Sequence, residues 1–232
     1  KKVTMIIILL VFMGIGFFVQ MRLKSKFKKY SKIPTASGLS GKEIAEKMLA
    51  DNGITSVVVQ SVPGKLTDHY NPTDKTVNLS PDVYNGRSVS AAAVAAHECG
   101  HAVQHATAYK WLGLRSQMVP IVNVSGKIIN FIFLAMIFGA FILKAFPLDL
   151  VFITLIIAQA AITAFTLVTL PVEYDASNRA LGWLRVAGVT GPEEHAQAED
   201  ALKWAARTYL VAALAAITSL AYYIMMFMGS RD

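Results

Sequence analysis

The sequence is poor in cysteine and in charged residues. Its single cysteine, Cys99, cannot form a disulfide within the chain, which excludes a disulfide-stabilised secreted module. Glycine and proline occur at ordinary levels, which excludes a collagen-like fibre, and a hydrophobic content of 54% excludes an intrinsically disordered chain. Only 16% of the 232 residues are charged, and the mean hydropathy of +0.47 is too high for an ordinary soluble domain. These features indicate a membrane protein.

Four apolar runs are long enough to cross about 30 Å of hydrocarbon, which takes roughly 20 helical residues. The runs are residues 4–20, 128–146, 150–170 and 209–228. We expect the first run to be a retained anchor, because no small-residue cleavage site follows it and the chain turns basic at once. The second run is interrupted only by Lys144 near its end, where the side chain can reach the interface. The second and third runs are predicted to form a membrane hairpin.

The distribution of lysine and arginine predicts the orientation of the chain. Of the 22 lysines and arginines, 18 lie in residues 21–127 and 171–207, and the other four are Lys1, Lys2, Lys144 and Arg231. By the positive-inside rule, both polar segments face the cytoplasm. The basic run 22–32 is interpreted as a juxtamembrane stop signal that also touches anionic lipid. The net charge of +7 therefore does not indicate a nucleic-acid partner.

Residues 33–127 have the pattern of a small mixed domain. Ser40 precedes a predicted helix of about three turns that ends at Gly53, and the β-branched segments 54–62 and 75–79 predict strands around a turn at 71–74. Ser88 is the expected cap of an alanine-rich helix over 88–111. The fourth apolar run is expected to continue from an amphipathic helix that begins near Thr190.

The alanine-rich helix contains the HExxH pattern, formed by His97, Glu98 and His101. Residues four apart share one face of a helix, so both imidazoles can reach one zinc ion, and Glu98 can act as the general base on a zinc-activated water. A third protein ligand is needed. The best candidate is Glu173, since two predicted crossings separate it from His101 and so place both on the same side of the membrane.

Other residues compete for the third position. His105 lies two helical turns from His97, about 12 Å along the axis, which is too far for one ion. Asp175 is expected to point away from Glu173, and His195 lies in an acidic segment where we expect it to be solvent-exposed. Asp149 would be the ligand of a site-2-type intramembrane protease, but the predicted topology puts it on the opposite side.

Three residues are candidates for contacts with substrate or with the transition state. They are His69, Tyr70 and His105, although a plain turn is the simpler interpretation of the segment around His69 and Tyr70. Cys99 is expected to be a small buried residue and not a nucleophile, because no triad partner is placed for it.

Several segments together resemble a known family. The segments LTDHYNP, AAHECGHAVQHA and LPVEYDASNRAL, in this order along the chain, are similar to those of the YugP-like membrane zinc metallopeptidases of bacteria. The resemblance implies a gluzincin-type peptidase, distantly similar to the HtpX group, in which His97, His101 and Glu173 hold zinc and Glu98 is the base. The HtpX group has an aspartate four residues after the ligand glutamate, to orient a zinc-bound histidine. Here that residue is Ser177, which leaves Asn178, Asp68 or a backbone carbonyl as the partner.

The sequence as a whole predicts a mainly α, polytopic protein of a bacterial inner membrane, with about four transmembrane helices and a small cytoplasmic α+β zincin-like domain. The expected parts are an anchor (1–20), the zincin-like domain (21–127), a membrane hairpin (128–170), a segment with the third ligand (171–207) and a last membrane helix (208–232).

The predicted activity is zinc-dependent endopeptidase cleavage of membrane or membrane-near polypeptides, which would bind as extended chains along the strand at 76–79. By analogy with related proteases, protein quality control is the expected setting. A non-catalytic zinc-binding scaffold and an intramembrane protease remain the alternatives.

Overall fold

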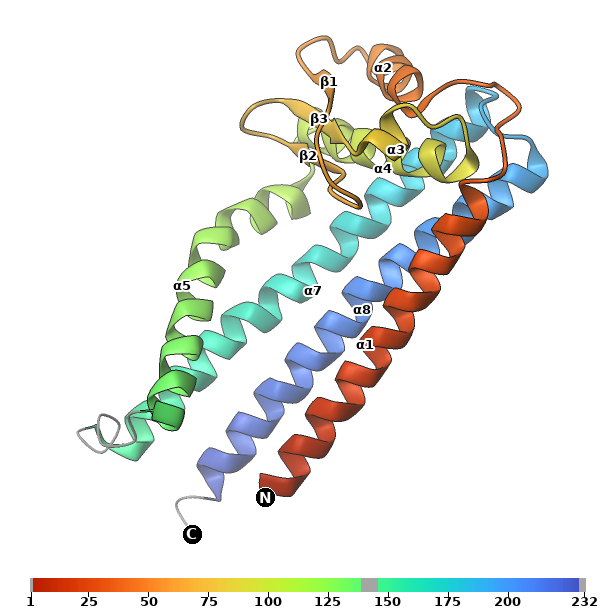
Figure 1. The fold of residues 1–232 in the computed structure, drawn as a ribbon. Helices are drawn as coiled ribbons and strands as arrows, with labels where there is room; N and C mark the ends of the chain where they lie inside the picture. Colours follow the sequence, from red (N-terminus) through yellow and green to blue (C-terminus); the bar gives the residue numbers. More distant parts are fainter. Residues whose placement is uncertain (1, 139–145, 230–232) are drawn as a thin grey trace. The chain divides into compact units, whose positions relative to one another are not determined.

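The computed structural model describes residues 2–138 and 146–229, which are mainly helical (Figure 1). Among them, three helices are long and apolar enough to cross a membrane: α5 (Lys110–Phe138), α7 (Leu148–Val186) and α8 (Pro192–Met228). The helix α1 (Lys2–Tyr30) contains the first predicted run but is not one of these three, so a count of four crossings stays a prediction. Lys1, Lys144 and Arg231 lie outside the described residues.

Two of the long helices continue past the ends of their apolar runs. Pro171 lies inside α7, and the helix proceeds through it to Val186. The helix α8 begins at Pro192, with two glutamates in its first turn, and runs without interruption to Met228. This confirms the prediction that the last apolar run continues an amphipathic helix. A proline at the first helical position and early acidic residues are both favourable at a helix N-terminus.

The described chain divides into two compact units. The first comprises the described residues within Lys1–Phe17, Leu114–Leu170 and Tyr209–Asp232, and it includes the apolar parts of α5, α7 and α8. The second comprises Phe18–Gly113 and Pro171–Thr208, and it contains both the HExxH helix and Glu173. The candidate site therefore lies within the second unit.

The second unit contains a three-stranded sheet with the order β1-β3-β2. Its strands are β1 (Val58–Ser61), β2 (His69–Asn71) and β3 (Thr76–Leu79). β1 pairs with β3 in parallel and β2 pairs with β3 antiparallel. The strands predicted from the β-branched segments are confirmed. The interpretation of His69 and Tyr70 as part of a plain turn is wrong, because they pair with Asn78 and Val77 of β3.

The central position of β3 contradicts one prediction about substrates. An extended substrate can add only to a strand edge that has no partner. Both edges of β3 are occupied, by β1 on one side and by β2 on the other. Pairing of a substrate with the strand at 76–79 is therefore wrong.

The helices of this unit begin where the sequence supplies a cap. Ser40 and Glu43 form a capping box at α2 (Gly41–Asp51), with the Ser40 amide donating to Glu43 Oε2 at 2.7 Å. Ser88 accepts a hydrogen bond from the Ala91 amide at the start of α4 (Val89–Ala106), and a short helix, α3 (Pro81–Tyr84), precedes it. The core joins α2, β3 and α4 to residues of α7 and α8, among them Ala180, Leu184, Ala198, Ala201 and Leu202.

Candidate metal centre

Three predicted ligands meet between α4 and α7. His97 and His101 lie one turn apart on α4, and Glu173 projects from α7. Their potential ligand atoms all lie within 4.8 Å of one another. Glu173 Oε2 is 3.3 Å from His97 Nε2 and 3.7 Å from His101 Nε2. The structure thus brings together two imidazoles and a carboxylate from segments far apart in the sequence, with His101 and Glu173 buried and His97 partly exposed.

A glycine on α4 permits this close approach of the two helices. A Cβ atom built on Gly100 would lie 2.5 Å from the carbonyl oxygen of Ala176 and 3.1 Å from its carbonyl carbon. Any larger residue would therefore collide with the backbone of α7. Gly100 lies between the two histidines, and Ala176 lies one turn beyond Glu173, so this contact sets the distance between the donors on the two helices.

The Nδ1 atoms of both histidines have hydrogen-bond partners. His97 Nδ1 lies 3.1 Å from Ser177 Oγ, and His101 Nδ1 lies 3.0 Å from Gln104 Oε1. Such contacts orient an imidazole and leave Nε2 as the atom available to a metal. In both rings Nε2 is the nitrogen that faces Glu173.

The Gln104 side chain is fully buried, and its amide orientation is fixed by α7. Gln104 Nε2 donates to Val172 O and to Asp175 Oδ2, each at 2.8 Å. Because the amide nitrogen has two acceptors, Oε1 is the atom that faces His101, and His101 Nδ1 must carry a proton to donate to it. The lone pair of His101 Nε2 then faces the cluster.

Glu98 is held by the sheet. Its carboxylate oxygen Oε2 accepts a hydrogen bond of 2.9 Å from the Tyr70 amide of β2. The Tyr70 side chain extends to α4, where its hydroxyl lies 2.8 Å from His105 Nδ1. Tyr70 therefore contacts the predicted base through its backbone and the predicted substrate-side residue His105 through its ring.

Burial and charge shift the pKa values of two residues on α4. Burial alone would lower the pKa of His101, but its hydrogen bond to Glu173 and the charges of Glu98 and Glu173 raise it overall. A proton and a metal cation therefore compete for this imidazole. Burial raises the pKa of the Cys99 thiol, whose sulfur lies against the carbonyl of Ala45. Cys99 is thus a buried, unreactive thiol, as predicted.

The structure places the competing ligands elsewhere. Asp175 accepts hydrogen bonds from Gln104 and from Arg179 Nε, the latter at 2.6 Å. Asp149 lies in the first turn of α7. The candidate substrate contact His69 is also engaged, because its ring Nδ1 lies 2.7 Å from Thr67 O.

His195 was expected to be exposed, and this is wrong. It is buried, with Arg185 Nη2 2.8 Å from its Nε2 and Thr190 Oγ1 3.3 Å from its Nδ1. The chain between α7 and α8 turns at Gly188, which has a positive φ of 65°, and so brings Arg185 back over the start of α8.

Sequence reasoning missed the partners of the histidines. The sequence pattern does not point to Gln104, and it marks Ser177 only as a departure from a related group. Of the candidates named instead, Asp68 accepts hydrogen bonds from Ser80 and Asn178 is exposed. The available signal was spacing, because Gln104 follows His101 by one turn and Ser177 follows Glu173 by one turn.

The donor set fits a zinc ion. Two neutral imidazoles and one carboxylate are the protein ligands of a His₂Glu catalytic zinc site, in which a fourth position stays open. Oriented Nε2 atoms and a buried carboxylate also match the ligand types that a cation of intermediate softness prefers. His97, His101 and Glu173 could therefore hold zinc.

Comparisons with known proteins agree with this chemistry. The chain is 41% identical over 220 residues to "Putative membrane protease YugP" of Bacillus subtilis (strain 168), and the alignment covers 95% of each chain. No solved structure matches it. A family model described as "Putative neutral zinc metallopeptidase" matches residues 5–228. The donor cluster, the relative and the family model together show that the chain belongs to this family of zinc metallopeptidases.

Proposed function

We propose that this protein is a membrane-bound zinc endopeptidase of the gluzincin type, with Glu98 as its general base. One observation carries the proposal. The two Nε2 atoms of an HExxH helix converge on the buried Glu173 carboxylate, while both Nδ1 atoms are held by hydrogen bonds. Stabilisation alone gives no reason to bury a carboxylate between two oriented imidazoles, since burying charge is costly.

Each residue of the site has a distinct task. Zinc, when bound, supplies Lewis acidity to the scissile carbonyl and to the attacking water. Glu98 accepts the proton of that water and passes it to the leaving amine. The Tyr70 amide occupies Glu98 Oε2, and no other described residue hydrogen-bonds Glu98 Oε1, so Oε1 is the oxygen that receives the proton.

The proposed setting is the cytoplasmic face of a bacterial inner membrane, with substrates that are membrane proteins or polypeptides close to the bilayer. The clustering of 18 of the 22 lysines and arginines in residues 21–127 and 171–207 supports this orientation, and the name of the YugP relative supports a membrane setting. We also propose that α1 is a fourth crossing, since residues 4–20 contain no charged side chain.

The Glu98→Gln variant tests the catalytic role. The amide oxygen of glutamine can still accept from the Tyr70 amide, so the fold and the metal ligands are preserved. With zinc-loaded full-length protein in detergent, we expect cleavage of an unstructured protein substrate to fall by about 10²- to 10⁴-fold with bound zinc unchanged. Equal cleavage by the variant and the wild type would refute Glu98 as the base, and zinc-loaded wild type that cleaves nothing in a broad peptide library would leave the scaffold alternative.

Metal analysis of two further variants tests the third ligand. We expect Glu173→Gln to lose stoichiometric zinc and Asp149→Asn to retain it. The opposite result would favour an intramembrane protease in which Asp149 is the ligand.

A further inference from the structure

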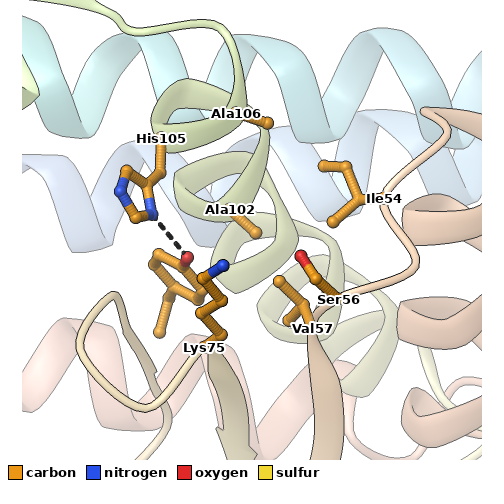
Figure 2. A pocket seen from close by; sticks show the side chains of 8 residues that line it. Ile54, Ser56, Val57, Lys75, Ala102, His105 and Ala106 are labelled. Carbon is orange, nitrogen blue, oxygen red and sulfur yellow. Dashed lines mark hydrogen bonds between the residues drawn. The ribbon is translucent and has the colours of Figure 1, made fainter.

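A small pocket lies beside the candidate site, on the other side of Tyr70. It has a volume of about 230 Å³ and is lined by residues of β2, of the last turns of α4 and of the segments before β1 and β3. Figure 2 shows Lys75 and His105 together on one side of it and Ile54 opposite. Pockets for drug-sized ligands are typically about 300 to 1,000 Å³, so this one has room for a single side chain or a terminal residue.

The pocket is close to the residues proposed to act on the scissile bond. Its His105 follows His101 by one helical turn, roughly 6 Å along the axis. Tyr70 lines the pocket with its side chain while its amide lies 2.9 Å from Glu98 Oε2. Because an extended peptide advances about 3.3 Å per residue, the pocket lies one or two substrate residues from the bond next to Glu98.

The polar groups of the pocket favour an anion. Lys75 contributes an ammonium group that makes no ion pair with any described residue. Burial raises the pKa of the Tyr70 hydroxyl, which keeps it protonated. If this hydroxyl donates to His105 Nδ1, the ring retains a proton on Nε2. If Nδ1 donates instead, the hydroxyl proton remains available. In the second case the Tyr70 hydroxyl gives the pocket a further hydrogen-bond donor beside Lys75, and Ser56 adds a hydroxyl.

Two features of the backbone support the binding of an anion in this pocket. Lys75 is held in a left-handed turn with φ of 52°, and its carbonyl accepts from the Val58 amide of β1 at 3.0 Å, so the base of its side chain is fixed. The carbonyl end of α4 is the negative end of the helix dipole and would oppose an anion. In the last turn of α4, the amides of Thr107 and Tyr109 already donate hydrogen bonds to the carbonyl oxygens of Val103 and Gln104. The positive charge of Lys75 therefore determines that the pocket binds a negatively charged group.

We propose that this pocket is a specificity subsite for a carboxylate, which binds to Lys75, the Tyr70–His105 pair and Ser56 while its methylene groups contact Ile54, Val57 and Ala102. This inference rests on the proposed peptidase function. It names the substrate class as polypeptides with an acidic residue, or with the chain terminus, one or two residues from the cleaved bond.

Kinetics with matched peptides tests the subsite. Zinc-loaded full-length protein is given a peptide series in which glutamate or glutamine occupies each position in turn, with the C-terminus free or amidated. We expect kcat/KM to be roughly five- to tenfold higher for glutamate at one position. Lys75→Gln should remove this preference, and the matched control Lys65→Gln should keep it, since Lys65 is exposed and does not line the pocket. If the higher kcat/KM requires a free C-terminus and not a glutamate side chain, the ligand is the terminal carboxylate.

Protection of Lys75 gives a second readout that needs no catalysis. Glutamate peptides should slow the acetylation of Lys75, measured by mass spectrometry with the zinc-loaded Glu98→Gln variant, and should leave Lys65 unaffected. Cleavage without any acidic or terminal preference, or an absence of selective protection, overturns the subsite. Selective protection combined with no cleavage by the wild type supports the subsite as a carboxylate-binding site and refutes the peptidase function alone.

Discussion

Because Gly100 packs against Ala176, we predict that adding one methyl group at Gly100 weakens metal binding while the protein still folds. In Gly100→Ala the new Cβ would lie 2.5 Å from the Ala176 carbonyl oxygen, whereas real Cβ atoms essentially never come closer than 3.0 Å and ordinary contact begins at 3.4 Å. The helices must therefore separate locally by about 0.5 to 0.9 Å. Metal–ligand distances are typically kept within about 0.2 Å, so the movement exceeds what the donors can absorb.

The effect on stability is expected to be smaller than the effect on the metal. Overpacking typically costs about 1 to 3 kcal/mol, and replacing a helical glycine by alanine returns about 1 kcal/mol. The variant should fold, with a net loss of roughly 0 to 2 kcal/mol, while its zinc affinity falls by at least about tenfold. Zinc affinity is measured by competition with a chelator, and stability by thermal unfolding of metal-free protein.

Gly182→Ala is the matched control, because this glycine lies on α7 and a Cβ atom added to it would meet nothing within 4 Å. It should stabilise the fold by about 0.5 to 1 kcal/mol and leave zinc affinity unchanged. If Gly100→Ala binds zinc as tightly as the wild type, the contact does not set the donor distance and the reasoning is refuted.

Three further predictions concern the ligand histidines and their hydrogen-bond partners. Ser177→Ala removes the partner of His97 Nδ1 and should weaken zinc binding about tenfold with little change in metal-free stability, as chelator competition and thermal unfolding can show; unchanged affinity would mean that Ser177 does not orient the ring. Gln104→Leu removes the acceptor of the buried His101 Nδ1 and the hydrogen bonds to Val172 and Asp175, and should lower the free energy of unfolding by about 1 to 3 kcal/mol in denaturant titrations; a loss below about 1 kcal/mol would contradict this. The pKa of His101 is raised in the metal-free protein, so its contribution to stability is present at low pH and is lost as the pH rises through that pKa. Zinc needs the neutral imidazole, so the stabilisation by zinc should instead grow with pH, and a pH-independent effect in thermal unfolding would refute the competition.

The parts of the site that could be predicted are those that depend on spacing and on topology. The pairing of His97 with His101 follows from the helix repeat, and Glu173 was identified because an even number of predicted crossings returns the chain to the same side. The roles of Gln104 and Ser177 could not be predicted in this way. Helical spacing places Gln104 beside His101, but which way its amide faces depends on its acceptors on α7, and whether Ser177 reaches His97 depends on the separation of α4 and α7 at Gly100.

The strand β2 and the burial of His195 could not be predicted from the sequence for a related reason. β2 has only three residues, and Tyr70 alone is of a type that favours strands, so its existence depends on pairing with β3. His195 is surrounded in the sequence by acidic and small residues typical of an exposed helix start. Its burial follows from Arg185, which the turn at Gly188 brings back against the ring.

The discontinuity of the second unit has a consequence for biosynthesis. A ribosome completes α4, with His97 and His101, before it has made either the apolar part of α7 or Glu173. The core is equally incomplete at that stage, because Ala180, Leu184 and Leu202 belong to later helices. A nascent chain therefore carries two of three donors on an unfinished domain. Under the proposed function, proteolytic activity can therefore arise only after the apolar part of α7 and Glu173 have been synthesised.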